Sequence, residues 1–209
     1  LVGSEMCIRD SSASEVLFVG EEFYPVIEQI KDEIPQIKKI IAVDDTHETF
    51  ESYIAWRDSQ ADDDPGISTS LDDDIIQLYT SGTTGHPKGV QLTNQNFSSA
   101  NDTIEGIVPF EEGTPNLVCM PGYHVAGTNW GIWGLVNGCK NIIIADIDPV
   151  LILELIEKEK IRSSLFVPAV ILFLVSIPQS AETDFSSLKF VLYGARQLLM
   201  ILFLRLKKL

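Results

Sequence analysis

Positive charge is scarce in this sequence. Only 15 of its 209 residues are lysine or arginine, against 30 aspartates and glutamates, and the formal net charge at pH 7 is -15. A chain this acidic repels nucleic acid and anionic membrane surfaces, so a general affinity for either is excluded. Any ligand that carries phosphate must therefore be held by a local site.

Cysteine and long apolar runs are scarce as well. Cys7, Cys119 and Cys139 are odd in number and have no CxxC spacing, so they suggest neither a disulfide framework nor a zinc site and favour a reducing, cytoplasmic compartment. The most apolar run, SLFVPAVILFLVSI at residues 164–177, contains Pro168 and is too short to span a bilayer. It predicts a buried strand followed by a buried helix.

The two ends of the chain differ from its middle. Residues 1–12 include VGSEMCIRDS, which resembles translated adapter sequence, and we expect them to be a non-native tail. Residues 196–209 turn abruptly leucine-rich and basic. Losing one base from codons for Ser-Pro-Ile-Ala-Asp-Asp yields Arg-Gln-Leu-Leu-Met, the sequence at 196–200, so we expect a shifted reading frame after Ala195. The alternative is an amphipathic terminal helix. The organised region is then 13–195.

The middle of the chain alternates short β-branched runs with longer amphipathic ones. With 45% apolar residues, this pattern predicts an α/β fold of mostly parallel sheets with flanking helices. The helix expected over 21–34 has an apolar face of Phe23, Ile27, Ile30 and Ile34. Asn94 is the expected cap of the helix that reaches Ile104. Further helices are predicted near 50–57, 130–136 and 150–160, and strands at 16–19, 39–45, 74–80, 88–93, 116–120, 141–145, 164–167 and 188–193.

A polar connection, SQADDDPGISTSLDDD, precedes the strand predicted at 74–80. Its proline and glycine indicate a surface segment. Its aspartate clusters are of a type that binds cations, but consecutive aspartates on a loop are more often simply solvated.

The strand predicted at 74–80 leads into the stretch YTSGTTGHPKGV, residues 79–90. Its glycines permit close approach to a polyanion, and its hydroxyls and backbone N–H groups supply donors. Lys88 adds a positive charge and Pro87 stiffens the turn before it. The predicted phosphate-binding residues are Thr80, Ser81, Gly82, Thr83, Thr84, Gly85 and Lys88.

This turn is not the P-loop of mononucleotide-binding proteins. The P-loop pattern, G-x-x-x-x-G-K-[ST], places a glycine before the lysine and a hydroxyl after it, whereas Lys88 follows Pro87 and precedes Gly89. A plain Gly/Ser/Thr hairpin is the alternative, and twelve consecutive residues of this composition argue against it.

The stretch 79–90 resembles the phosphate-loop signature of the adenylate-forming (AMP-binding) superfamily, which includes acyl-CoA synthetases, luciferases and the adenylation domains of peptide synthetases. The resemblance runs from about Val16 to Ala195 and is strongest to fatty-acid and other acyl-CoA synthetases. It implies that the chain is part of the large N-terminal domain of such an enzyme.

Two further segments carry the resemblance. In MPGYHVAGTNWG, residues 120–131, His124 stands where acyl- and aryl-CoA ligases place a histidine beside the acyl carboxylate, with Tyr123 where phenylalanine is usual. In isolation, this histidine would more often be a satisfied core residue. In LYGA, residues 192–195, the resemblance implies that Tyr193, Gly194 and Ala195 lie against the nucleotide and acyl pocket. Alone, this segment reads as an ordinary turn.

The chemistry that the resemblance implies uses ATP, Mg²⁺ and coenzyme A. A carboxylate attacks the α-phosphate of ATP, pyrophosphate leaves, and a thiolate then displaces AMP from the acyl-adenylate. The family's later Tyr-Gly-x-Thr-Glu segment, its ribose-binding aspartate and its C-terminal adenylating lysine have no match here, so this chain alone is expected to be inactive.

Three interpretations remain. The first is a partial acyl-CoA synthetase, an acid–thiol ligase. The second is an adenylation domain that loads a carrier protein, and the third is a non-catalytic ATP- or AMP-binding module. Trp130 and Trp133 follow His124 in a region that would line the acyl pocket, but their helical spacing favours a place in the core.

Overall fold

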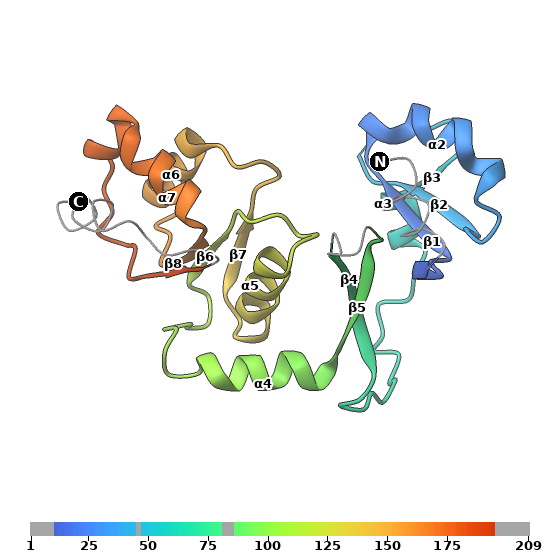
Figure 1. Cartoon of the computed structure of the whole chain (residues 1–209), viewed down its shortest axis with the longest axis horizontal. Helices are drawn as coiled ribbons and strands as arrows, with labels where there is room; N and C mark the ends of the chain where they lie inside the picture. Colours follow the sequence, from blue (N-terminus) through green and yellow to red (C-terminus); the bar gives the residue numbers. More distant parts are fainter. Residues whose placement is uncertain (1–10, 45–46, 81–85, 195–209) are drawn as a thin grey trace. The chain divides into compact units, whose positions relative to one another are not determined.

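The structure is a computed structural model that describes residues 11–44, 47–80 and 86–194. The chain divides into two compact units, Leu1–Gln91 and Leu92–Leu209, and each is described by itself (Figure 1). Among the described residues, no helix has both the length and the apolar character needed to cross a membrane. Both units combine parallel strands with helices, which confirms the predicted α/β class.

The first unit contains a parallel three-stranded sheet in the order β1-β2-β3. Val19, Ala42 and Phe50 pack with Tyr24 to form its core. The strand β3 was not predicted, because two residues are too few to show a period of two. The strands are β1 (Val16–Val19), β2 (Lys39–Ala42) and β3 (Glu51–Ser52), and the helix α3 (Tyr53–Asp58) follows.

The helix predicted over 21–34 is broken into three pieces. They are η1 (Glu21–Phe23), α2 (Tyr24–Ile30) and η2 (Lys31–Glu33). Pro25 has no N–H to continue an i→i−4 ladder from η1, so the α-helix begins at Tyr24. The predicted apolar face is wrong at Phe23, which is 55% exposed, and Tyr24 is buried instead.

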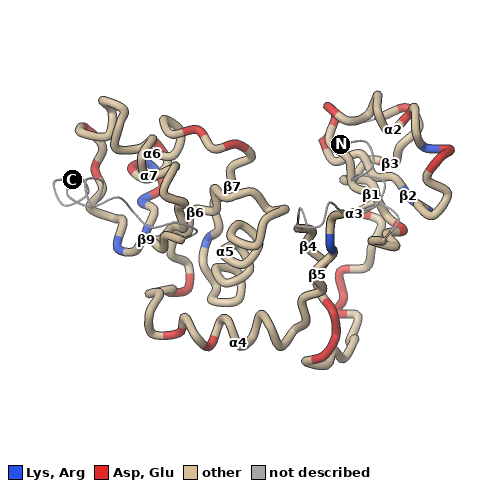
Figure 2. Tube along the Cα trace, viewed as in Figure 1, with Lys and Arg blue, Asp and Glu red and all other residues tan. Residues whose placement is uncertain are grey.

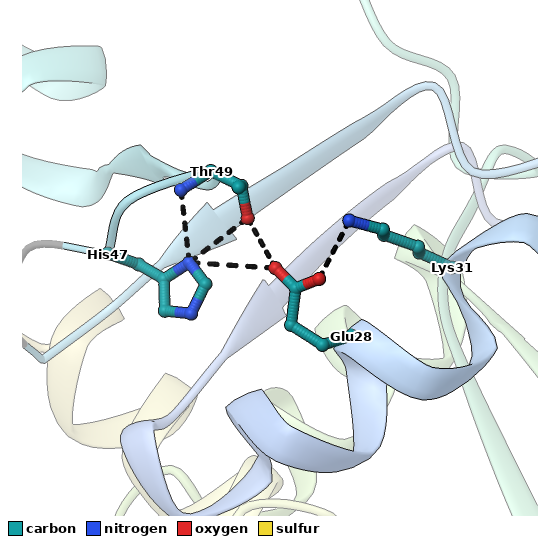
Figure 3. A network of polar contacts seen from close by, with 4 residues as sticks. All are labelled: Glu28, Lys31, His47 and Thr49. Carbon is teal, nitrogen blue, oxygen red and sulfur yellow. Dashed lines mark hydrogen bonds and ion pairs between the residues drawn. The ribbon is translucent and has the colours of Figure 1, made fainter.

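A polar network ties α2 to the segment before β3 (Figure 3). The Glu28 carboxylate accepts hydrogen bonds from Lys31 Nζ at 2.7 Å and from Thr49 Oγ1. The Thr49 backbone N–H donates to His47 Nδ1 at 3.3 Å, and the His47 ring stacks on Phe50 with centroids 4.2 Å apart. The network connects α2 to residues 47–50 beside the small apolar core of this unit. This structural role was not predicted from the sequence.

The strands β4 (Asp74–Thr80) and β5 (Lys88–Thr93) pair in a separate two-stranded sheet. Gly89 permits a close crossing here, since a Cβ at this position would lie 2.1 Å from Gln77 Nε2 and 3.0 Å from Tyr79 Cζ. Gln77 Nε2 in turn donates to the Tyr79 hydroxyl at 2.8 Å. Both strands occupy the predicted residues, so this prediction is confirmed.

The segment before β4 is exposed and acidic, as the red stretch beside β4 in Figure 2 shows. Two of its aspartates shape local turns: Asp64 Oδ1 accepts from the Gly66 N–H at 2.9 Å, and Asp73 Oδ2 accepts from the Ser70 N–H at 2.7 Å. The described residues contain no group of three or more His, Cys, Asp or Glu that could hold a metal ion.

The second unit is built on a parallel sheet in the order β7-β6-β8-β9. Its helix α5 packs on β6 and β7, while α6 and α7 pack against each other. Right-handed crossovers place α6 and α7 on the face opposite α5. The elements are α4 (Asn94–Ile104), β6 (Pro115–Val118), α5 (Val125–Val136), β7 (Lys140–Ile143), α6 (Pro149–Lys158), β8 (Ser163–Phe166), α7 (Pro168–Ser176), η3 (Pro178–Ala181) and β9 (Phe190–Tyr193).

Of three predictions about this unit, one is confirmed, one is wrong and one holds in part. Trp130 and Trp133 are 1% and 9% exposed, which confirms their place in the core. Asn94 is not the cap of α4 but its first residue, because Thr93 supplies the capping oxygen. The helix after Pro168 is buried on one face only, since Leu172 and Phe173 are 47% and 55% exposed.

Candidate functional site

Thr80 and Lys88 flank the predicted phosphate-binding turn. Thr80 is the last residue of β4 and Lys88 the first residue of β5, while Ser81, Gly82, Thr83, Thr84 and Gly85 lie outside the described residues. A connection this short joins only antiparallel neighbours, so Thr80 and Lys88 stand at the same end of the pair. Both are exposed, and Lys88 forms no ion pair within the described part of the chain. Its ammonium is available to a phosphate.

His124 is the N-cap of α5 in the second unit. Its Nδ1 atom accepts the Ala126 backbone N–H at 3.1 Å, so the neutral ring carries its proton on Nε2. The side chain is exposed, which rules out the alternative of a satisfied core histidine. The Nε2–H group can therefore donate to an approaching carboxylate, and the positive end of the α5 dipole favours negative charge at the same place.

The turn before His124 is held tightly against the start of α5. The His124 N–H donates to the Pro121 carbonyl oxygen at 3.1 Å, and Thr128 Oγ1 donates to the Gly122 carbonyl oxygen at 2.5 Å. A Cβ on Gly127 would lie 2.3 Å from the carbonyl oxygens of both Met120 and Pro121. Glycine at 127 therefore lets the helix begin directly against this turn.

The order of the strands places His124 at the point where the connections between strands switch from one side of the sheet to the other. From β6 the chain passes to β7 on one side, and from β8 it passes to β9 on the other. The carboxyl ends of β6 and β8 thus form a topological switch point, the usual ligand crevice of open α/β sheets. His124 follows β6 by six residues and lies at this edge of the sheet.

Tyr193 and Gly194 lie at the same edge. Tyr193 ends β9, which is parallel to β8, and its side chain is 51% exposed. Because β8 separates β9 from β6, Tyr193 is two strand spacings, about 10 Å, from the end of β6. Gly194 has open space where a Cβ would stand, and Ala195 lies outside the described residues. The structure thus gathers two of the three predicted segments, His124 and Tyr193–Gly194, on one edge of the second unit.

Cys119 lies between β6 and His124 but is not a reactive group. Its side chain is 3% exposed, and burial raises the pKa of the thiol to about 11. Its Sγ donates to the Leu165 carbonyl oxygen at 3.7 Å. A thiol this buried and this weakly acidic behaves as a small core residue.

A polar cluster beneath α5 could not be predicted from the sequence. Asn116, Asn141 and Ser163 occupy neighbouring strands and join through their side chains. The only local signal is the presence of polar residues within otherwise apolar strands. Their meeting depends on strand register, which the sequence does not reveal.

The parallel sheets and the helices that flank them define a protein of the α/β class. The family of AMP-binding enzymes matches residues 4–209, and the chain belongs to this family. The predicted membership in the adenylate-forming superfamily is confirmed.

Individual relatives agree with this assignment. The chain is 31% identical over 192 residues to the fatty acid–[acyl-carrier-protein] ligase ScoC of Streptomyces coeruleorubidus, covering 90% of this chain and 36% of that protein. It is 29% identical to the long-chain-fatty-acid–CoA ligase FadD13 of Mycobacterium tuberculosis, with the same coverage of 90% and 36%. The chain therefore spans about a third of the length of these curated relatives.

A solved structure extends the likeness to three dimensions. The inhibitor-bound N-terminal domain of FACL13 from Mycobacterium tuberculosis superposes with a TM-score of 0.85 at 27% identity, covering 99% of this chain and 50% of that one. This confirms the predicted fold, part of the N-terminal domain of an adenylate-forming enzyme.

Proposed function

We propose that the full-length protein carrying this chain activates a carboxylic acid, a fatty or other acyl acid, with ATP. A carboxylate oxygen attacks the α-phosphorus, the bond to the β-phosphate breaks, and pyrophosphate leaves. A thiolate, that of coenzyme A, then attacks the acyl carbon of the adenylate and AMP leaves. Fatty-acid ligases among the relatives support this reaction class.

The observation that carries the proposal is the exposed Lys88 ammonium at the first residue of β5, which forms no ion pair among the described residues. Charge accumulates on the leaving pyrophosphate, and donors already oriented toward it lower the barrier without reorganisation. Lys88, with Thr80 and residues 81–85, would meet this charge. His124 would orient the carboxylate, and Tyr193, Gly194 and Ala195 would border the nucleotide and the acyl group.

The described residues contain no group of three or more His, Cys, Asp or Glu that could hold a metal ion, so we assign Mg²⁺ no ligand among them and derive no step through it. ATP and coenzyme A are co-substrates of the proposed reaction.

The test is ATP–pyrophosphate exchange by the full-length protein against fatty, aryl and amino acids. Lys88→Ala should lower exchange about 100- to 1,000-fold, the usual effect of removing one oriented donor. Lys140→Ala is the matched control, because Lys140 is also exposed but is paired with Glu159 at 2.8 Å, at the amino end of β7. Unchanged exchange in Lys88→Ala would contradict the role of Lys88. If the full-length protein shows no exchange with any of the acids, the result would favour a non-catalytic nucleotide-binding module.

A second candidate differs in the thiol that accepts the acyl group. The 31% identical relative is named for a carrier protein rather than coenzyme A. Release of AMP with coenzyme A alone would support the first candidate, whereas release that requires a phosphopantetheinylated carrier protein would support the second.

A further inference from the structure

A continuous line of buried polar side chains crosses the second sheet beneath α5. Ser163 Oγ on β8 donates to Asn116 Oδ1 on β6 at 2.9 Å, and Asn116 Nδ2 donates to Asn141 Oδ1 on β7, also at 2.9 Å. Asn141 Nδ2 then donates to the Gly131 carbonyl oxygen of α5 at 2.7 Å. Asn116 is paired in register with both Asn141 and Ser163, so the three side chains share one rung of the sheet.

The line is fully buried at Asn116 and Ser163 and half-buried at Asn141. Asn116 is 0% exposed and Ser163 is 1% exposed. An unpaired buried amide would destabilise the fold, whereas apolar residues of suitable size at these positions would pack well enough for folding. Hydrogen bonds are directional and apolar contacts are not, so the line restricts how α5 can lie on the sheet more than apolar packing would.

Gly134 shows that helix and network fit each other closely. A Cβ at this position would lie 2.2 Å from Asn141 Oδ1 and 2.5 Å from Asn116 Nδ2. The α5 backbone therefore rests directly on the two amides. Together with the Asn141–Gly131 hydrogen bond, this contact fixes both the rotation of α5 about its axis and its height above the sheet.

His124 is the residue that this anchoring places. It caps α5 seven residues before Gly131, which is about 10 Å along the helix axis. A small tilt or slide at the anchor is carried to the N-terminus of a rigid helix. We propose that Asn116 and Asn141 are positioning residues that hold α5, and through it His124, in the geometry needed to orient the carboxylate. This inference rests on the proposed function.

The test uses the full-length protein and four forms: wild type, Asn141→Ala, His124→Ala and the double variant. Asn141→Ala should lower kcat/KM for the carboxylic acid about 10- to 100-fold, because a misplacement near 1 Å has effects of this size. The KM for ATP should stay within about twofold. In the His124→Ala background, Asn141→Ala should have little further effect, since residues that act through one another are not additive.

Two additional variants serve as a control and as a second test of the hydrogen-bonded line. Ser187→Ala removes a half-buried hydrogen bond, from Ser187 Oγ to the Ile156 carbonyl oxygen of α6 at 3.4 Å, whose partners lie outside α5. It should leave kcat/KM for the acid unchanged. Asn116→Ala should reproduce the effect of Asn141→Ala, and if it does not fold, the half-buried Asn141 still carries the test. Thermal unfolding of every variant verifies that it is folded at the assay temperature.

The outcomes separate the two proposals. Equal losses from Asn141→Ala in the presence and absence of the His124 imidazole would show general weakening of the fold and overturn the positioning role. Wild-type kinetics in Asn141→Ala would overturn it as well. If the wild-type protein itself shows no exchange with any acid, the proposed function fails and the positioning role fails with it.

Discussion

At the scale of single residues, the neighbourhood of His124 contains a thiol that could be mistaken for a functional group. Cys119 follows β6 and precedes His124 by five residues, yet its thiol faces the core and donates to the Leu165 carbonyl oxygen. Burial raises its pKa to about 11. Position near a site thus does not make a cysteine an acyl acceptor, because both the access and the thiolate are missing.

Cys119 should accordingly resist alkylation in the native protein. At pH 8 a pKa near 11 leaves roughly one thiol in a thousand ionised, whereas an ordinary cysteine is about a quarter ionised. We expect peptide mass spectrometry to show no iodoacetamide adduct on Cys119 until the protein is unfolded in urea. Labelling at the same rate with and without urea would contradict the burial described here.

At the scale of elements, α4 shows how strongly one helix depends on its N-cap residue. Thr93 Oγ1 accepts the Asn96 N–H at 3.3 Å, and Asn96 Oδ1 accepts the Thr93 N–H at 2.9 Å, forming a capping box. Only Phe97 of the helix is buried. With so little apolar surface to hold it, α4 relies on this cap more than the other helices of the second unit do.

Thr93→Ala should destabilise the protein by about 1 kcal/mol, the usual cost of losing a hydroxyl cap. The measurement is the free energy of unfolding in urea. Thr103→Ala is the control on the same helix, since Thr103 Oγ1 only donates back to the Ser99 carbonyl oxygen at 2.7 Å. Its effect should stay within about 0.5 kcal/mol. Equal effects of the two variants would contradict the capping role.

The elements also show what the sequence predicts and what it does not. Strands with continuous β-branched runs, such as Lys39–Ala42, were found at their predicted places because their apolar pattern is local. The start of α5 at Val125 was missed, because three glycines weaken its helical pattern. The glycine-rich turn could be proposed as a phosphate site from the sequence because its residues are consecutive, and that role stays a prediction. The Asn116–Asn141–Ser163 line could not, because it depends on pairing among three strands.

At the scale of the whole molecule, acidic residues outnumber basic ones by 30 to 15, and some of the carboxylates are stabilised as anions. The pKa of Glu28 is lowered chiefly by its hydrogen bond from Lys31, and that of Glu159 by its hydrogen bond from Lys140. The Ser186 side chain, followed by the Ser186 N–H and Lys160, lowers the pKa of Asp184 to about 2. Each of these groups favours the folded state only while it is ionised.

The lowered pKa of Asp184 predicts how the stability of the protein depends on pH. The folded-state pKa of Asp184, about 2, lies below the value of about 3.9 for an unfolded aspartate, so its contribution is fully present above about pH 4 and is lost as pH falls through 2. Asp184→Asn should therefore lower the urea midpoint at pH 7, and the difference from wild type should shrink below about pH 4 and vanish only below about pH 2. Glu182→Gln is the control, because Glu182 is exposed and forms no ion pair among the residues that the structure describes, and its small difference should not follow this course. A wild-type–Asp184→Asn difference that stays constant from pH 7 to pH 2 would show that the stabilisation does not come from the ionised carboxylate.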